Sequence, residues 1–324
     1  MRKCAVILAG GVGDYLLGNR HVPNILSKFN LKFVDLISVG VKKDRVITIG
    51  NFIKDSFPSF YQNLHYFIVS EENFNPTTSY QYNNFNEEQR SIVDSYDCVF
   101  ELTTDSLMFL KYELPILKSF HNFPTPTFYD NRIFKNKYII AHFFQRENVG
   151  GHVQMNPKNA RRIVEILSKN YSVVCPVFAD NKELNKRNLD NSGCTFYDCE
   201  LSDLWSLSKY CSLCIGISSS VRLFPAHFGI PSLVLFGEGK PFSDIPPFRI
   251  RWGIFPERTF PKDVNPELLC QVADNIIKKP ELSLYPDIPA EVSDNVFLKT
   301  NNESSNPLYR KFLQFNENSH INIP

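Results

Sequence analysis

Short apolar runs alternate with helix-length segments along this sequence of 324 residues. Residues 3–9 form an apolar run that ends in glycines, as expected of a strand covered on both faces in a parallel sheet. A helix is expected over residues 15–29. Further strands are expected at residues 33–39, 45–49, 66–69 and 98–102. Their separations fit crossover connections, so the first half predicts a doubly wound α/β domain.

The second half repeats this architecture. Strands are expected at residues 138–144, 172–178, 212–217 and 232–236. Helices are expected at residues 159–168, 201–210 and 221–228. The sequence therefore predicts a second doubly wound domain.

Composition suggests where the domains end. Residues 73–89, rich in Asn, Thr, Tyr and Glu, are expected to be an exposed insertion, and residues 120–131, with two prolines, are the expected linker. We expect a first domain at residues 1–132, a second at 133–290 and a polar tail at 291–324. Within the tail, residues 307–315 are expected to form a helix, and the tail is expected to pack back on the first domain.

Charge and cysteine usage limit the partners and the compartment. The 35 Lys and Arg residues nearly balance the 34 Asp and Glu residues, so we expect no nucleic-acid partner. Several of the eight cysteines lie in apolar runs, where thiols behave as small hydrophobic groups. We therefore expect a cytoplasmic protein. No apolar stretch reaches the roughly 18 residues of a membrane span, so a membrane-attached substrate would be approached by peripheral contact with the surface.

The first segment with chemical potential is Gly10-Gly11-Val12-Gly13-Asp14, where the first strand gives way to a helix. Glycines there let backbone amides approach a ligand. A dinucleotide fingerprint requires a glycine at the position of Leu16, and Asp14 would lie beside a bound pyrophosphate, so the pattern argues against a nicotinamide fold. Asp14 has two interpretations: a helix cap that the macrodipole favours, or the catalytic base for a hydroxyl acceptor.

The second segment is the turn after the strand at residues 212–217. Ser218, Ser219 and Ser220 precede a helix, where hydroxyls and free amides suit a phosphate, and Arg222 adds a positive charge in the first turn. The alternative is that the serines only cap the helix and Arg222 lies on its solvent face. The first interpretation makes these four residues donor-binding candidates.

Two more segments follow strand ends. Glu238 could accept hydrogen bonds from sugar hydroxyls and Lys240 could meet a phosphate beside Gly237, or the segment is a glycine-rich surface turn. His142 ends a strand and Arg146 lies in the next loop; both are donor-site candidates, although a histidine at a strand end is often structural. The sequence shows no Asp and His cluster that suggests a catalytic metal, and we predict no metal and no cofactor.

Residues 4–18 and 200–240 together resemble the heptosyltransferases of glycosyltransferase family nine. That family opens with a strand and a Gly-Asp pair at the head of a helix, which Gly13-Asp14 matches. Its second domain has a strand, a helix, a Gly-Thr-Pro turn and a strand ending in Phe-Gly, an order that residues 217–237 keep without a gap. The resemblance implies the GT-B architecture, an α/β fold of two Rossmann-like doubly wound domains that face each other across a cleft.

The chain also departs from the family motif. Ser218 stands where the family has Asp, Ser220 replaces a glycine, and Leu223 occupies the position of a histidine. These departures leave the donor sugar and the donor base open.

The resemblance implies an enzyme that moves a sugar from a nucleotide diphosphate donor to a saccharide or another hydroxyl acceptor. The acceptor would bind the first domain at Gly11, Gly13 and Tyr15, and the donor would bind the second. Asp14 would deprotonate the acceptor hydroxyl, which attacks opposite the leaving diphosphate and inverts the anomeric centre without a metal. Two alternatives stay open: a nucleotide-sugar epimerase of the same fold, and a non-catalytic nucleotide-sugar-binding relative. The sequence does not indicate an oligomeric state.

Overall fold

The computed structural model describes residues 2–71, 81–102, 124–128, 132–145, 154–217, 219–235, 252–254, 264–279 and 307–320. The chain divides into two compact units. Unit 1 comprises Met1–Leu117, Phe242–Pro247 and Ile288–Pro324, and unit 2 comprises Lys118–Pro241 and Phe248–Asp287. Among the described residues, each unit contains one sheet and every strand pairing is parallel.

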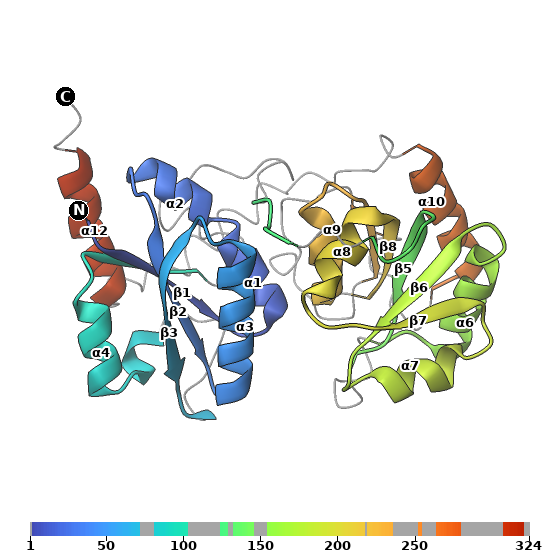
Figure 1. The fold of residues 1–324 in the computed structure, drawn as a ribbon, viewed down its shortest axis with the longest axis horizontal. Helices are drawn as coiled ribbons and strands as arrows, with labels where there is room; N and C mark the ends of the chain where they lie inside the picture. Colours follow the sequence, from blue (N-terminus) through green and yellow to red (C-terminus); the bar gives the residue numbers. More distant parts are fainter. Residues whose placement is uncertain are drawn as a thin grey trace. The chain divides into compact units, whose positions relative to one another are not determined.

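Unit 1 is built on a four-stranded sheet with the order β3-β2-β1-β4 (Figure 1). Its strands are β1 (Cys4–Ala9), β2 (Val34–Gly40), β3 (Tyr61–Ile68) and β4 (Cys98–Glu101). Its helices are α1 (Val12–Asn19), α2 (Val22–Lys28), α3 (Lys43–Ser56), α4 (Glu87–Asp94) and α12 (Pro307–His320), with a 3-10 turn η2 (Gln81–Asn84). β1 and β2 pair up to Ala9 opposite Val39, so their carboxyl ends are adjacent.

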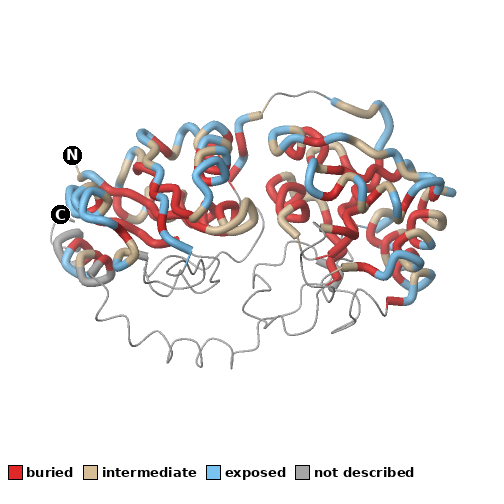
Figure 2. Tube along the Cα trace, turned by 90° about the horizontal axis from the view of Figure 1, so that it is seen from below, coloured by how far each residue is buried: buried red, intermediate tan, exposed pale blue. Residues whose placement is uncertain are grey.

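The strands form the buried centre of each unit, and exposed residues gather on the helices and turns (Figure 2). All six residues of β1 are buried. Ala5 and Ile7 belong to a core cluster with Phe67 and Val93, while Leu8, on the opposite face, lies close to Gly18 of α1. The apolar run at the start of the sequence is therefore a strand covered on both faces, as predicted.

The strand expected at residues 45–49 is wrong, because these residues belong to α3. The β-branched residues in that run favour a strand. The buried positions of α3, however, repeat at helical spacing: Val46, Ile49, Gly50 and Ile53. α3 packs against β2 and β3 as a crossover helix.

The single helix expected over residues 15–29 is two helices, α1 and α2, separated at Arg20 and His21. Pro23 lies in the first turn of α2. Proline has no N–H to donate to the preceding turn, so α1 cannot continue through this position.

Residues 81–89 form η2 and the start of α4, and although most of them are exposed or half-exposed, Phe85 anchors the segment to the core. Phe85 is 2% exposed, and its ring lies edge-on to the ring of Phe67 with centroids 4.9 Å apart. Asn86 caps α4 by accepting a hydrogen bond from the Gln89 amide at 2.9 Å, and the Gln89 side chain accepts from the Asn86 amide at 3.0 Å. This reciprocal pair is a sequence signal for a helix start. Residues 73–80 of the expected insertion lie outside the described residues.

α12 completes the core of unit 1 from a distant part of the sequence. It packs against β4 (Figure 1). The Phe312 ring lies 6.2 Å from the Phe29 ring and 6.1 Å from the Phe100 ring, both edge-on, and Phe312 is fully buried. The helix extends beyond the expected residues 307–315.

Unit 2 is built on a six-stranded sheet with the order β10-β9-β8-β5-β6-β7. Its strands are β5 (Tyr138–His142), β6 (Ser172–Val177), β7 (Cys194–Asp198), β8 (Cys211–Ile217), β9 (Ser232–Leu235) and β10 (Trp252–Ile254). Its helices are α6 (Pro157–Leu167), α7 (Lys182–Leu189), α8 (Asp203–Tyr210), α9 (Leu223–Ala226) and α10 (Pro266–Lys278), with a 3-10 turn η5 (Ser220–Arg222). Counted along the chain, this is the 3-2-1-4-5-6 order of a Rossmann sheet, and the order reverses between β5 and β8.

Unit 2 differs from the sequence prediction in several places, and α7, α10 and β10 were not predicted. The helix expected at residues 221–228 is replaced by η5 and the four-residue α9, which contains Pro225. β7 was not predicted, because it is a short edge strand with mostly half-exposed and exposed residues. Of the expected linker, residues 124–128 belong to unit 2, and the Pro124 carbonyl oxygen lies 2.8 Å from Nδ1 of His227.

No helix in the described ranges is both long enough and apolar enough to cross a bilayer.

Candidate functional site

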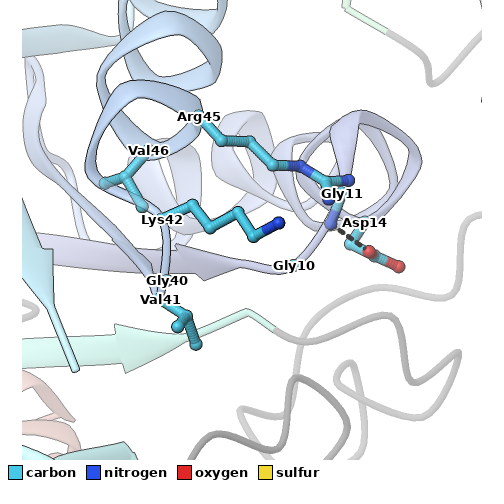
Figure 3. Close-up of a pocket in the computed structure, with 8 residues that line it drawn as sticks. All are labelled: Gly10, Gly11, Asp14, Gly40, Val41, Lys42, Arg45 and Val46. Atoms are coloured by element: carbon cyan, nitrogen blue, oxygen red, sulfur yellow. Dashed lines mark hydrogen bonds between the residues drawn. The ribbon is translucent and has the colours of Figure 1, made fainter. Parts of the chain in front are cut away.

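A pocket of about 250 Å³ lies in unit 1 where β1 and β2 end and α1 and α3 begin (Figure 3). Its lining residues are Gly10, Gly11, Asp14, Gly40, Val41, Lys42, Arg45 and Val46. Ligands of parallel α/β sheets collect at this carboxyl edge. Two residues of the predicted site, Gly11 and Asp14, line this pocket.

The Gly10-Gly11 turn is shaped around the Asp14 carboxylate. Gly10 has φ +99°, a conformation that L side chains rarely adopt, and a Cβ there would overlap the Asp14 carboxylate. The Gly11 amide donates a hydrogen bond to Oδ2 of Asp14. The helix-cap interpretation of Asp14 thus has a structural basis. Asp14 is nevertheless partly exposed and lines the pocket.

Two cations that the sequence interpretation missed share this pocket. Lys42 precedes α3 and Arg45 lies in its first turn, and both side chains extend toward Gly11 and Asp14 (Figure 3). A Cβ at Gly11 would lie 3.2 Å from Nη2 of Arg45 and 3.3 Å from Oδ2 of Asp14. Neither cation forms a hydrogen bond or an ion pair within the described part of the chain. The missed signal was the helical spacing of the residues after Lys43.

The other two acceptor-side candidates do not line the pocket. Tyr15 is 1% exposed, and its hydroxyl lies 2.7 Å from Oγ of Ser38 and donates to the Val39 carbonyl at 3.3 Å. Burial raises the pKa of the Tyr15 phenol. Tyr15 is therefore a core residue of unit 1, which corrects its expected place beside the acceptor. Gly13 lies in the first turn of α1, partly exposed, and is absent from the pocket lining.

In unit 2, His142 and Ser219 meet at the point where the strand order reverses. His142 is the last residue of β5, and Ser219 follows the carboxyl end of β8. Oγ of Ser219 lies 3.0 Å from Nδ1 of His142, and the tautomer decides which atom donates. The Ser219 side chain makes no capping bond to η5. Its hydroxyl therefore joins two strand ends instead of closing the turn as a cap.

Burial keeps His142 neutral. Its side chain is 4% exposed, and desolvation lowers its pKa to about 4. A neutral imidazole offers one donor and one acceptor and no charge at neutral pH. The strands approach closely here, because a Cβ at Gly216 would overlap the His142 carbonyl. Glycine at position 216 thus permits the contact that brings His142 next to Ser219.

Arg222 is buried, which corrects the alternative that places it on a solvent face. The residue is 7% exposed, and its carbonyl accepts a hydrogen bond from Oγ of Ser232 at 3.3 Å. Burial raises the pKa of the Cys214 thiol to about 12, and the Arg222 charge partly opposes this shift. Ser220 is half-buried in η5. Five other donor candidates lie outside the described residues: Arg146, Ser218, Gly237, Glu238 and Lys240.

Among the described residues, no group of three or more His, Cys, Asp and Glu side chains is placed to hold a metal ion. All eight cysteines are free, and seven of them are buried. Desolvation raises the pKa of their thiols, for example that of Cys4 to about 12. The raised pKa favours the protonated form of these thiols, which is the less nucleophilic one.

No protein-family model matches the chain, and no curated protein is similar to it in sequence. Solved structures are similar in fold. The glycosyl transferase family 9 protein of Veillonella parvula DSM 2008 is 12% identical, with 86% of this chain and 98% of that chain covered and a TM-score of 0.54. The E. coli ADP-heptose lps heptosyltransferase II is 11% identical, with coverage of 86% and 100% and a TM-score of 0.58.

A third structure, E. coli heptosyltransferase WaaC with ADP, is 9% identical, with coverage of 86% and 99% and a TM-score of 0.53. At these identities the likeness concerns the fold. The aligned part covers 86% of this chain, whose described residues form two parallel sheets. The chain therefore has the α/β fold of the GT-B glycosyltransferases and resembles those of family nine.

Proposed function

We propose that this protein is a glycosyltransferase that moves a sugar from a nucleotide diphosphate donor to a hydroxyl acceptor. Unit 1 binds the acceptor and unit 2 binds the donor. The observation that carries the proposal is the position of Asp14, a partly exposed carboxylate in a pocket at the carboxyl edge of β1 and β2. A general base needs this combination of access and a fixed orientation, and the bond from the Gly11 amide supplies the orientation.

In the proposed reaction, Asp14 takes the proton of the acceptor hydroxyl as the acceptor oxygen forms its bond to the anomeric carbon. The bond from that carbon to the donor diphosphate breaks on the opposite face, so the configuration inverts in one step. The electron pair of the broken bond leaves with the diphosphate.

The donor phosphates are assigned to the turn after β8. Ser219 and Ser220 offer hydroxyl and amide donors there, and His142 orients the Ser219 hydroxyl through the 3.0 Å contact. Arg222 contributes its positive charge from the interior of the same turn. Such preorganised donors stabilise the charge that develops on a leaving diphosphate, and the proposal assigns no metal to this step. Residues 146, 218, 237, 238 and 240 remain proposed donor contacts.

The expected partners are a nucleotide diphosphate sugar and a saccharide, or another acceptor with a hydroxyl group. The buried thiols fit a reducing, cytoplasmic compartment. An acceptor anchored to a membrane would be reached by peripheral contact with the membrane surface.

Release of nucleoside diphosphate from a panel of nucleotide sugars, with and without saccharide acceptors, tests the proposal. The decisive variant is Asp14→Asn, because an amide oxygen can still accept from the Gly11 amide while the basic carboxylate is lost. We expect turnover to fall about 100-fold or more, as for removal of a general base. The matched control is Asp44→Asn, which removes an exposed acid in the first turn of α3, away from the pocket lining.

Near-normal turnover by a folded Asp14→Asn protein would show that Asp14 is only a helix cap. A change of sugar stereochemistry without any acceptor would instead identify a nucleotide-sugar epimerase. Donor binding without release or transfer across the panel would identify a non-catalytic nucleotide-sugar-binding protein.

A further inference from the structure

β3 forms the outer edge of the unit 1 sheet (Figure 1). It pairs with β2 on one side and, among the described residues, with no strand on the other. Natural edge strands commonly carry charged side chains, which keep other strands from pairing with their unpaired backbone groups. At one edge of the unit 2 sheet, for example, β7 ends at Asp198, which forms an ion pair with Lys182 at 2.8 Å. β3 contains no Lys, Arg, Asp or Glu, so its edge lacks this protection.

The backbone of β3 directs alternate residues toward β2 and away from it. Ile68 lies opposite Gly40, and the Gly40 carbonyl accepts a hydrogen bond at 3.0 Å from the amide of the residue after Ile68. In a parallel pair this register turns the N–H and C=O groups of Leu64, Tyr66 and Ile68 outward. Within the described chain, one of these six groups has a partner: the Ile68 carbonyl accepts from Nε2 of Gln89 at 3.2 Å. The other five can pair with another strand.

Exposed apolar side chains occupy the same positions of β3. Tyr66 is 39% exposed and Ile68 is 37% exposed, and they are two of the four large apolar side chains exposed among the described residues. Both lie on the face of the sheet that α3 covers, because alternate residues of a strand share a face and the Tyr66 hydroxyl donates to Oδ1 of Asn51 in α3 at 2.6 Å. A strand added at this edge would bring side chains next to Tyr66 and Ile68.

The residues of β3 favour a second β3 as that strand. Antiparallel pairing about a twofold axis near Tyr66 places Leu64 of one copy opposite Ile68 of the other, so apolar side chains meet across the axis. No formal charges are brought together, since β3 has no Lys, Arg, Asp or Glu and burial lowers the pKa of its one histidine, His65. An acidic or basic peptide, in contrast, would find no complementary charge along the strand.

We propose that the protein forms a twofold dimer in which β3 pairs antiparallel with β3 of a second copy, joining the two unit 1 sheets into one. This interface is separate from the pocket of unit 1, because no residue of β3 lines the pocket. A single strand pair is a small interface, so the dimer should dissociate on dilution.

Sedimentation velocity over a dilution series measures the oligomeric state of the full chain, and NMR-detected hydrogen exchange locates the contact. We expect twice the mass of one chain at high concentration. The amides of Leu64, Tyr66 and Ile68 should exchange at least about 10-fold faster on dilution, when their partners leave. The amides of His65 and Phe67, which the register directs toward β2, should be protected at every concentration. This alternation distinguishes strand pairing from a dimer formed through another surface.

Charge at the axis provides the decisive variants. Tyr66→Lys places two like charges close together in the dimer, and we expect the dissociation constant to rise about 10-fold or more. Tyr66→Glu should weaken the dimer in the same way, whereas a mixture of the two variants should form a dimer again because opposite charges then meet. Leu313→Lys is the matched control, since it adds the same charge at an apolar side chain of α12 that is also 39% exposed. Circular dichroism establishes that each variant is folded.

A chain that sediments as a monomer at every concentration would overturn the proposal. Slow exchange of the outward amides in that monomer would show that another segment of the same chain covers the edge, and fast exchange would leave the edge to a different partner. A dimer that Tyr66→Lys does not weaken, or that Leu313→Lys weakens equally, would place the contact elsewhere and overturn the proposal as well.

Discussion

Because His142 is buried and neutral, we expect the stability of unit 2 to depend on pH. Its pKa is about 4 in the folded chain because of burial, whereas an unfolded histidine titrates near 6.5. The folded pKa is the lower one, so the unfolded state takes up the proton first as pH falls. The contribution of the neutral His142 to the free energy of unfolding is therefore fully present above pH 6.5 and is lost as the pH falls from 6.5 to 4. Linkage gives a loss of about 2 kcal/mol between about pH 7.5 and pH 5 from this residue alone.

The test compares the natural protein with His142→Asn, whose amide oxygen can take the place of Nδ1 opposite Ser219. Both tryptophans, Trp205 and Trp252, lie in unit 2, so fluorescence during urea unfolding reports on that unit. The difference in unfolding free energy between the two proteins should change by about 2 kcal/mol over this pH range.

Ser219→Ala is the control for this experiment. It removes the hydroxyl partner and keeps the buried imidazole, and desolvation is the stated cause of the shift. Its pH dependence should follow that of the natural protein. If His142→Asn and the natural protein lose stability in parallel from pH 7.5 to pH 5, His142 titrates alike in both states and the reasoning fails.

Two further predictions concern unit 1. Phe312→Ala should destabilise it by about 3–5 kcal/mol, because a fully buried ring is lost, whereas Leu313→Ala, at a side chain 39% exposed, should cost much less. Unfolding is followed by far-UV circular dichroism, and tryptophan fluorescence separates out the unfolding of unit 2. An equal effect of both variants would contradict the packing of Phe312 in the core. Tyr15→Phe should lower the free energy of unfolding by about 1 kcal/mol, because the hydrogen bonds to Ser38 and Val39 are lost, and should leave turnover of nucleotide sugar unchanged. A large loss of turnover by the folded variant would place Tyr15 beside the acceptor.

The strands that pack on both faces could be predicted from the sequence, because a short, continuous apolar run such as that of β1 is typical of a strand with no face toward water. The strand prediction for residues 45–49 was wrong for a physical reason. β-branched side chains favour strands locally, whereas the helical repeat of buried residues becomes visible only over the longer span to Ile53. Tertiary packing settled that conflict. The edge strand β7 has little burial and gives a weak signal.

The site was predicted unevenly. The sequence singled out the glycine turn and Asp14, which line the pocket, because glycines at a strand end indicate close approach of the backbone to a ligand. Arg45 was missed because residues 45–49 were assigned to a strand instead of α3, and Lys42 was missed because the start of α3 at this position was not predicted. The buried position of Arg222 depends on contacts with β8 and β9, which no local pattern encodes.

The packing of α12 against β4 has a consequence for synthesis on the ribosome. The aromatic face formed by Phe29 and Phe100 is made early, but the helix that covers it ends at residue 320. During translation this aromatic face of unit 1 stays uncovered until unit 2 has been synthesised and α12 follows it. A nascent chain stalled before residue 307 should therefore be the species that chaperones recognise and proteases remove.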